Sequence, residues 1–530
     1  MYRYDSTVNA NRFPLRLLSS LAASLLLAFP LATAQTQLPV SKTPNLPNLG
    51  EAASEDLSPV MERKLGEEIM RDIRRDHDYL DDPPILEYLN NLGNILVTAR
   101  PGARGDANFN YNFFAVRDPM LNAFALPGGF IAVHSALLLA AQSESELASV
   151  LSHEIGHVAQ RHIARQLGQQ RQDSLIPLAA MILAALAAKS SGDAAMGVFT
   201  AGQGLAIQRQ LNFGRDAERE ADRVGFQIMG EAGFDTSGMV AFFQRMQAAT
   251  RNYSDLLPAY LLTHPLTTER IADIQARIRE QPYKQRLDNL DFFLVRSRAR
   301  VLQDESTKGL AEATVFFENQ IEQQSRQQIS AGQYGLAMVA LKKRDFAAAQ
   351  KWLDKCRATI DRPPAPGAFS SPVPKGQTAT VLAYLSLEIK LEQEDKPAVI
   401  QQALQEAETA HVRFPLSRGI VYQYADALIK SGKLEDAARF LRDQVQLYRE
   451  EPELYDLLAQ AYSKQGKMSL QHIALAESYV LQGGTMAALD QLVLARKASD
   501  ASFYDQAVID ARERELQARR REALGEKKKD

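Results

Sequence analysis

The 530-residue chain is poor in cysteine and has little excess charge of either sign. Its one cysteine, Cys356, excludes an internal disulfide, so stability has to come from packing and from any bound metal. Cys356 lies in an apolar-periodic segment, which predicts a buried small side chain. Lys and Arg number 61 against 64 Asp and Glu, a formal net charge of -3. This balance provides no basic field for nucleic acid, and we expect no such partner.

The chain also lacks the several apolar runs of about 20 residues that a polytopic membrane protein needs. Its first apolar run, Leu17–Leu31, is about 15 residues long and falls short of a span. Three arginines precede this run, and Ala32-Thr33-Ala34 follows it. This pattern predicts a cleavable secretory signal over residues 1–34, with a membrane anchor as the alternative. We therefore expect an exported protein.

The length of the chain predicts two or three domains rather than one hydrophobic core. Residues 35–57 are rich in Pro, Asn, Ser and Thr and predict a flexible linker. Apolar residues then recur at helical spacing on both sides of Asp82-Pro83-Pro84, which predicts two helices before residue 100.

The pattern next changes to short β-strands. After an alternating stretch at residues 110–113, two strands are predicted at residues 122–126 and 130–133, joined by Pro127-Gly128-Gly129. Ser143 followed by Glu146 is a capping box, which predicts the start of a helix of about five turns. A small sheet therefore precedes the helix that carries the chemistry.

After residue 305 the apolar pattern is helical throughout and repeats. Placing Gly432 over Gly466, an offset of 34 residues, superimposes several large and small apolar positions. Thirty-four residues is the tetratricopeptide period, and an offset of 88 suggests a further unit near residues 330–356. This favours a helical solenoid over a non-repetitive helical domain.

The predicted helix after Ser143 carries His153-Glu154-Ile155-Gly156-His157. Four residues apart on one helical face, His153 and His157 can direct two imidazole nitrogens at one metal ion. Glu154 projects beside them as a general base. The arrangement predicts one Zn²⁺ per chain and metal-assisted hydrolysis of a peptide bond, with a chance motif match as the alternative.

A catalytic zinc site needs a third protein ligand. Downstream, Glu218 and Asp222 stand one helical turn apart, so we expect Glu218 to bind the metal and Asp222 to contact a ligating histidine or the proton network of the site. Glu220 points away from Asp222 on the helical wheel and fits less well. A solvated helix face is the alternative for this charged cluster.

These two motifs, with Asn122 to Gly129 before them, resemble the HExxH…ExxxD signature of the zinc metallopeptidases that include HtpX, Oma-type and CAAX prenyl proteases. The resemblance implies a zincin-like α+β fold, zinc ligation by His153, His157 and Glu218, catalysis by Glu154, and an orienting or proton-donating role for Asp222. The predicted signal peptide and the predicted helical repeats make the chain most similar to the periplasmic members of this family that enhance β-barrel assembly.

We therefore expect a mostly α chain in five parts. They are a signal peptide (1–34), a linker (35–57), a zinc metallopeptidase domain with a small β-sheet (58–300), a tetratricopeptide solenoid (305–500), and a C-terminal helix with a charged tail (501–530).

His264 stands before Pro265 and so is held out of the helical region, presented on a loop. It would either stabilise the oxyanion or occupy the fourth zinc position at rest, with a structural histidine as the alternative. His162 has rotated about 140° from His157 on an ideal helix, which makes it a poor ligand. His77, His134, His411 and His472 have no companions at ligand spacing.

Two further segments bear on substrates. Residues 175–206 contain an apolar insertion, either buried, lying on a membrane surface, or covering the cleft as a lid. The strand from Asn122 through Ala123, Phe124 and Ala125 would pair with extended substrate if it lies at a sheet edge; an internal strand is the alternative.

The resemblance implies a periplasmic endopeptidase, with chaperone activity as an additional function, that acts in assembly and quality control of outer-membrane proteins. Its expected partners are unfolded or stalled clients, the assembly machinery through the repeats, and a membrane surface. The rival hypothesis is a chaperone or scaffold whose peptidase fold serves as a binding module. Glu154→Gln separates the two.

Overall fold

The computed structural model describes residues 57–105, 107–168, 214–252, 260–261, 264–281, 286–323, 325–362 and 377–523. All of them belong to one compact unit that begins at Asn48. The predicted signal peptide, nearly all of the predicted linker and the apolar insertion at residues 175–206 lie outside this part of the chain.

Two helices open the described fold, as the spacing around Asp82 predicts. Helix α1 spans Pro59–Ile73 and α2 spans Pro83–Ala99, followed by the short 3-10 turn η2 (Pro101–Arg104). The Ser58 hydroxyl accepts from the Met61 N–H, and the Asp82 carboxylate accepts from the Ile85 N–H. Each side chain satisfies a free donor of the first turn, and a proline follows each cap, where its missing N–H costs nothing.

The three strands form one sheet in the order β1-β3-β2. Strand β1 (Asn112–Val116) is parallel to β3 (Phe130–His134), and β2 (Ala123–Leu126) is antiparallel to β3. Gly128 and Gly129 join β2 to β3 at φ 77° and 92°, the left-handed region that favours glycine. The predicted hairpin is therefore confirmed.

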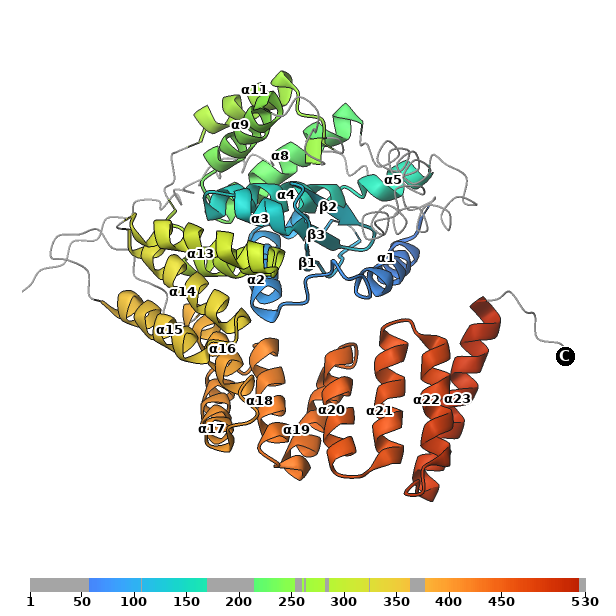
Figure 1. Cartoon of the computed structure of the whole chain (residues 1–530). Helices are drawn as coiled ribbons and strands as arrows, with labels where there is room; N and C mark the ends of the chain where they lie inside the picture. Colours follow the sequence, from blue (N-terminus) through green and yellow to red (C-terminus); the bar gives the residue numbers. More distant parts are fainter. Residues whose placement is uncertain are drawn as a thin grey trace, which may run out of the picture. The chain divides into compact units, whose positions relative to one another are not determined.

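The helices around the sheet follow in chain order. They are α3 (Ser135–Ala140), α4 (Glu144–Ala159), α5 (His162–Gly168), α8 (Arg215–Glu231), α9 (Ser237–Asn252), α11 (Thr268–Arg279) and α12 (Leu290–Gln303). The Ser143 hydroxyl accepts from the Glu146 N–H, so α4 begins where the capping box predicts. Every residue of α4 is buried, and in Figure 1 this helix lies between the sheet and α8.

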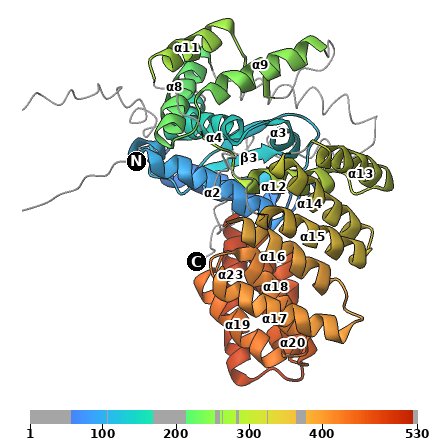
Figure 2. The ribbon, with the colours of Figure 1, turned by 90° about the vertical axis from the view of Figure 1, so that its left-hand side faces the viewer.

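The remaining helices form antiparallel pairs stacked in sequence order (Figures 1 and 2). They are α13 (Thr307–Ile321), α14 (Arg326–Lys342), α15 (Phe346–Asp361), α16 (Gln377–Leu391), α17 (Pro397–Arg413), α18 (Arg418–Lys430), α19 (Leu434–Leu447), α20 (Pro452–Lys464), α21 (Met468–Leu481), α22 (Thr485–Lys497) and α23 (Phe503–Ala523). Gly432 and Gly466, aligned in the sequence, both end helices at positive φ, 80° and 75°. The predicted class, a mostly α chain with one small sheet and a helical solenoid, is confirmed.

One hydrophobic core runs from Leu80 to Ile389 and so crosses from the helices around the sheet into the first helical pairs. The domain limits at residues 300 and 305 stay a prediction. Cys356 is fully buried, as expected, and its thiol donates to the Ser330 carbonyl. Among the described helices, none has both the length and the apolar composition needed to cross a membrane.

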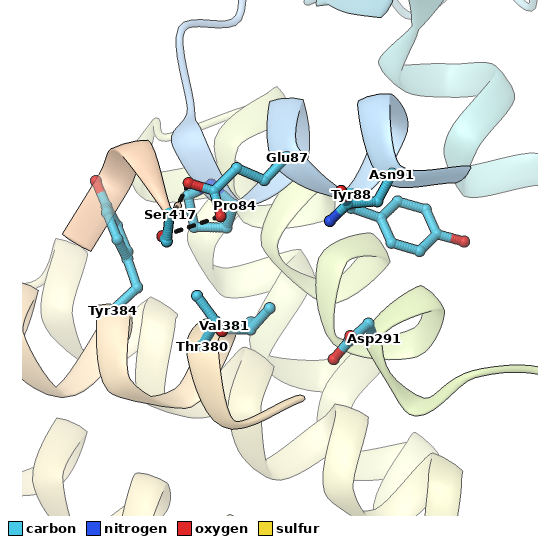
Figure 3. A pocket seen from close by; sticks show the side chains of 9 residues that line it. All are labelled: Pro84, Glu87, Tyr88, Asn91, Asp291, Thr380, Val381, Tyr384 and Ser417. Atoms are coloured by element: carbon cyan, nitrogen blue, oxygen red, sulfur yellow. Dashed lines mark hydrogen bonds between the residues drawn. The ribbon is translucent and has the colours of Figure 1, made fainter. Parts of the chain in front are cut away.

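A polar cavity lies where α2 and α12 meet α16 and α18 (Figure 3). The Glu87 carboxylate on its wall accepts from the Ser417 hydroxyl at 2.9 Å and from the Gly419 N–H at 2.9 Å, at the start of α18. A carboxylate at a helix N-terminus is favourable, so this contact holds α2 to α18.

Candidate metal centre and active site

Helices α4 and α8 approach each other unusually closely. A Cβ atom at Gly156 would lie 2.9 Å from the Ala221 carbonyl oxygen, and one at Gly225 would lie 2.9 Å from the His153 nitrogen. Because neither glycine carries a side chain, the two backbones can touch. This contact brings the histidines of α4 to the carboxylates of α8.

Four potential ligand atoms, three from α4 and α8 and one from His264, meet at one point. The Nε2 atoms of His153 and His157 are 3.0 Å apart. The Nδ1 atom of His264 lies 3.3 Å from His153 Nε2 and 3.0 Å from a Glu218 carboxylate oxygen. Glu218 lies 3.4 Å from His153 Nε2 and 3.5 Å from His157 Nε2. All four side chains are about 1% exposed.

This donor set fits a zinc ion. Tetrahedral ligands at about 2.0–2.1 Å from zinc stand about 3.3 Å from one another, close to the spacings of this cluster. Three imidazoles and one carboxylate are also ligand types that zinc accepts. His153, His157 and Glu218 would hold the ion, and His264 lies in the position of a fourth ligand.

The charges of the site favour a cation. Burial alone would lower the pKa of His153, but its hydrogen bonds to Asp222 and Glu218 raise it to about 10. For Glu218, burial alone would raise the pKa, but the electrostatic interaction with His264 and the hydrogen bonds to His153 and His264 hold it well below its usual range. The carboxylates that favour a proton here would equally favour a metal ion.

Glu154 lies beside the cluster without joining it. The side chain is fully buried, with one carboxylate oxygen 3.5 Å from His264 Nε2. The N–H of Ala125 in β2 faces the same carboxylate. Burial raises the pKa of Glu154, and the nearby His264 and His153 partly oppose this rise.

Asp222 stands behind the first histidine. Its carboxylate lies 2.9 Å from His153 Nδ1, the nitrogen that faces away from the cluster. Arg270 of α11 donates to both oxygens of Asp222, at 2.6 and 2.8 Å, and lies 2.9 Å from Glu218. Asp222 thereby orients His153, and Arg270 fixes both carboxylates. Arg270 is not among the residues predicted from the sequence, because no local motif surrounds it.

His264 reaches the cluster from a different segment. The backbone N–H of His264 donates to the backbone carbonyl of Tyr260, and the centres of the two rings lie 4.7 Å apart. The Tyr260 N–H in turn donates to the Leu121 carbonyl, just before β2. The segment that carries His264 is therefore attached to the strand at the edge of the sheet.

Two residues judged unsuitable as ligands on the helical wheel also belong to the site. His162 contacts His157 from behind, with 2.9 Å between their Nδ1 atoms, and its Nε2 lies 3.0 Å from Glu220. Neither residue joins the metal-facing group. The predicted rotation of His162 assumes that the helix of His157 continues, but α4 ends at Ala159.

The other histidines lie elsewhere. His77 is exposed, His134 contacts the Met120 carbonyl, His411 stacks on Tyr424, and His472 contacts Gln491.

Strand β2 forms one edge of the sheet. The His134 N–H donates to the Asn122 carbonyl, so in the register of β2 and β3 the groups of Asn122 and Phe124 face β3. Along a strand, the direction of the backbone N–H and C=O groups alternates from one residue to the next. Those of Ala123 and Ala125 therefore point to the outer edge, where the described residues place no further strand.

Comparison with known proteins agrees with this geometry. The model of peptidase family M48 matches residues 93–278, which include all three strands, α4, α8 and α11. A β-barrel assembly-enhancing protease of Yersinia pestis is 30% identical over 515 residues, covering 94% of this chain and 96% of that protein. The chain belongs to peptidase family M48.

Other M48 relatives match over shorter stretches. A putative β-barrel assembly-enhancing protease of Vibrio cholerae is 42% identical over 256 residues, 48% of this chain and 51% of that protein. The mitochondrial metalloendopeptidase OMA1 of Schizosaccharomyces pombe is 34% identical over 180 residues, 34% of this chain and 50% of that protein. For this M48 peptidase, the family assignment supports a metallopeptidase centre at the His-His-Glu-His cluster.

Proposed function

We propose that this M48 peptidase is a periplasmic zinc endopeptidase that degrades misassembled outer-membrane proteins and assists their assembly. The observation that carries the enzymatic part is the buried four-donor cluster with the Glu154 carboxylate beside it. The cellular part is supported by the β-barrel assembly-enhancing proteases that match along nearly the whole chain, and by the predicted signal over residues 1–34.

The chain's own residues divide the chemistry among them. A bound zinc ion would supply Lewis acidity at the scissile carbonyl. Glu154 takes a proton from the attacking water and delivers it to the leaving amine. Asp222, held by Arg270, keeps His153 in the tautomer whose Nε2 lone pair faces the cluster.

In the resting state His264 closes the site. Its Nδ1 fills the place a fourth ligand would take, and every member of the cluster is about 1% exposed. Withdrawal of His264 is required before water and a peptide carbonyl can enter. The alternative role of His264 is to stabilise the oxyanion. That role also requires the segment that carries His264 to move away from the cluster.

Substrate would bind as an extended strand along β2. The outward groups of Ala123 and Ala125 offer main-chain hydrogen bonds with little sequence preference, which suits unfolded or stalled β-strands. The helical pairs would then supply selectivity by docking the assembly machinery. Contact with a membrane surface through residues 175–206 remains part of the proposal.

The closed cluster also favours a rival function, a chaperone or scaffold that binds clients without cleaving them. The deciding experiment compares wild-type protein with Glu154→Gln in zinc content, casein cleavage and complementation of a null strain. The enzyme proposal expects zinc to stay bound while cleavage falls by about 10² to 10⁴-fold. Unchanged cleavage, or full complementation by Glu154→Gln, would overturn it in favour of the scaffold.

A further inference from the structure

His157 has a polar support of its own that resembles the one behind His153. Its Nε2 faces the metal cluster, and its Nδ1 lies 2.9 Å from Nδ1 of His162. The far nitrogen of His162, Nε2, lies 3.0 Å from a Glu220 oxygen. The Arg165 guanidinium holds that same oxygen at 3.0 Å.

The turn after α4 places His162 there. Gln160 caps the end of α4, and Arg161 then adopts φ 51°, a left-handed conformation that is uncommon for a residue with a side chain. Arg161 is 3% exposed and is tied to Glu62 of α1 at 3.0 Å. Because the chain reverses at Arg161, the imidazole of His162 folds back beneath His157 instead of following the helical rotation.

The contacts fix where each proton lies. The Glu220 carboxylate only accepts, so a neutral His162 carries its proton on Nε2 and presents Nδ1 as an acceptor. Nδ1 of His157 then carries the proton and donates to His162. This leaves the lone pair of His157 on Nε2, the atom that faces the other ligands.

We propose that His162 and Glu220 are positioning residues that hold His157 in its metal-binding tautomer. Helix α8 would thus place a carboxylate behind each histidine: Asp222 directly behind His153, and Glu220 behind His157 through His162. This inference rests on the proposed zinc site. It identifies the residues that hold His157, as Asp222 and Arg270 hold His153.

The test measures zinc affinity of the full mature chain by chelator competition, which does not depend on turnover. His162→Phe keeps the ring but removes both nitrogens, and we expect about 10- to 100-fold weaker zinc binding with faster release. His162→Asn keeps an acceptor at the position of Nδ1 and should restore most of the affinity. Glu220→Gln should weaken binding by allowing the reverse proton arrangement.

Matched controls come from the same structure. Glu231→Gln alters a half-exposed carboxylate on α8, and His77→Phe alters an exposed histidine; both should bind zinc as the wild type does. Thermal unfolding of the metal-free protein shows whether His162→Phe folds. If it does not, Glu220→Gln is the deciding variant, because Glu220 is partly exposed and its replacement disturbs packing less.

The outcomes separate the two proposals. Wild-type protein that binds no zinc would overturn the proposed function itself. Wild-type protein that binds zinc, with His162→Phe and Glu220→Gln of equal affinity, would overturn only the positioning role. Equal loss in His162→Phe and His162→Asn, with an unchanged Glu220→Gln, would likewise reduce His162 to a packing residue.

Discussion

Gly156 of α4 and Ala221 of α8 touch backbone to backbone, with 2.9 Å between the Ala221 carbonyl oxygen and the place of a Cβ at Gly156. The neighbour is main chain and cannot rotate away, so Gly156→Ala has to separate the helices. We expect a loss of about 1–3 kcal/mol in stability together with weaker zinc binding. Thermal unfolding and chelator competition measure the two effects.

The control is Gly230→Ala on α8, where the nearest neighbours of a Cβ are side-chain atoms of Gln281 and Thr236 at 3.4 Å. This change should leave zinc affinity unaltered. Equal affinity in Gly156→Ala would show that the helix contact does not set the ligand geometry.

His264→Ala should open the cluster. If His264 closes the fourth position at rest, its removal raises casein cleavage and self-cleavage by the zinc-loaded protein. Zinc affinity should fall at the same time, because one donor is lost. A drop in cleavage of about 10² to 10³-fold would instead identify an oxyanion donor and contradict the resting role.

Ala125→Pro removes an N–H that points to the outer edge of β2. Proline is tolerated at an edge strand, so the fold should persist while pairing with extended substrate weakens. We expect a higher KM for unfolded protein. Since the same N–H faces Glu154, kcat is measured separately; a change in kcat alone would count against strand pairing. Phe124→Ala is the control for side-chain contact.

Arg298 joins the sheet-bearing part to the helical pairs. It is 2% exposed, lies 2.7 Å from Asp82 and 2.9 Å from Glu388, and its loss would leave buried carboxylates without a partner. Arg298→Met should therefore destabilise the chain by about 3–5 kcal/mol. Denaturant unfolding measures this, with exposed Arg439→Met as control. A cost below about 1 kcal/mol would contradict a coupling role.

Glu453 at the start of α20 should give a pH-dependent stability. Glu453 is exposed at its surface, but partial desolvation and the neighbouring charges of Asp456, Asp81 and Asp426 raise its pKa from 4.5 to about 7. A raised pKa means that the charged form disfavours folding: the penalty is absent below pH 4.5, grows as the pH rises, and is complete above about 7.

Glu453→Gln should therefore stabilise the chain at pH 8, by about 1 kcal/mol after allowance for its partial exposure, and not at pH 4. Thermal unfolding across this range, with the exposed Glu312→Gln as control, provides the comparison. A benefit of equal size at pH 4 and pH 8 would contradict the electrostatic cause.

Local rules were enough wherever residues close in sequence decide the structure. Ser143 marks the start of α4, Asp82-Pro83-Pro84 separates the first two helices, and two glycines mark the hairpin, because capping and left-handed turns involve neighbouring residues. Helical periodicity likewise predicts that His153 and His157 share one helical face. It also predicts that Glu218 and Asp222 share a face of another helix.

The sequence by itself thus determined which residues share a face on α4 and on α8, the helical character of the chain after residue 305 and the small sheet. Only the tertiary structure decided what surrounds the ligands: Arg270 behind Asp222, His264 at the cluster, and His162 beneath His157. These contacts depend on how two glycines bring α4 to α8 and on how Arg161 reverses the chain. Neither event follows from local periodicity, because the distance between two helices depends on packing between segments far apart in the sequence.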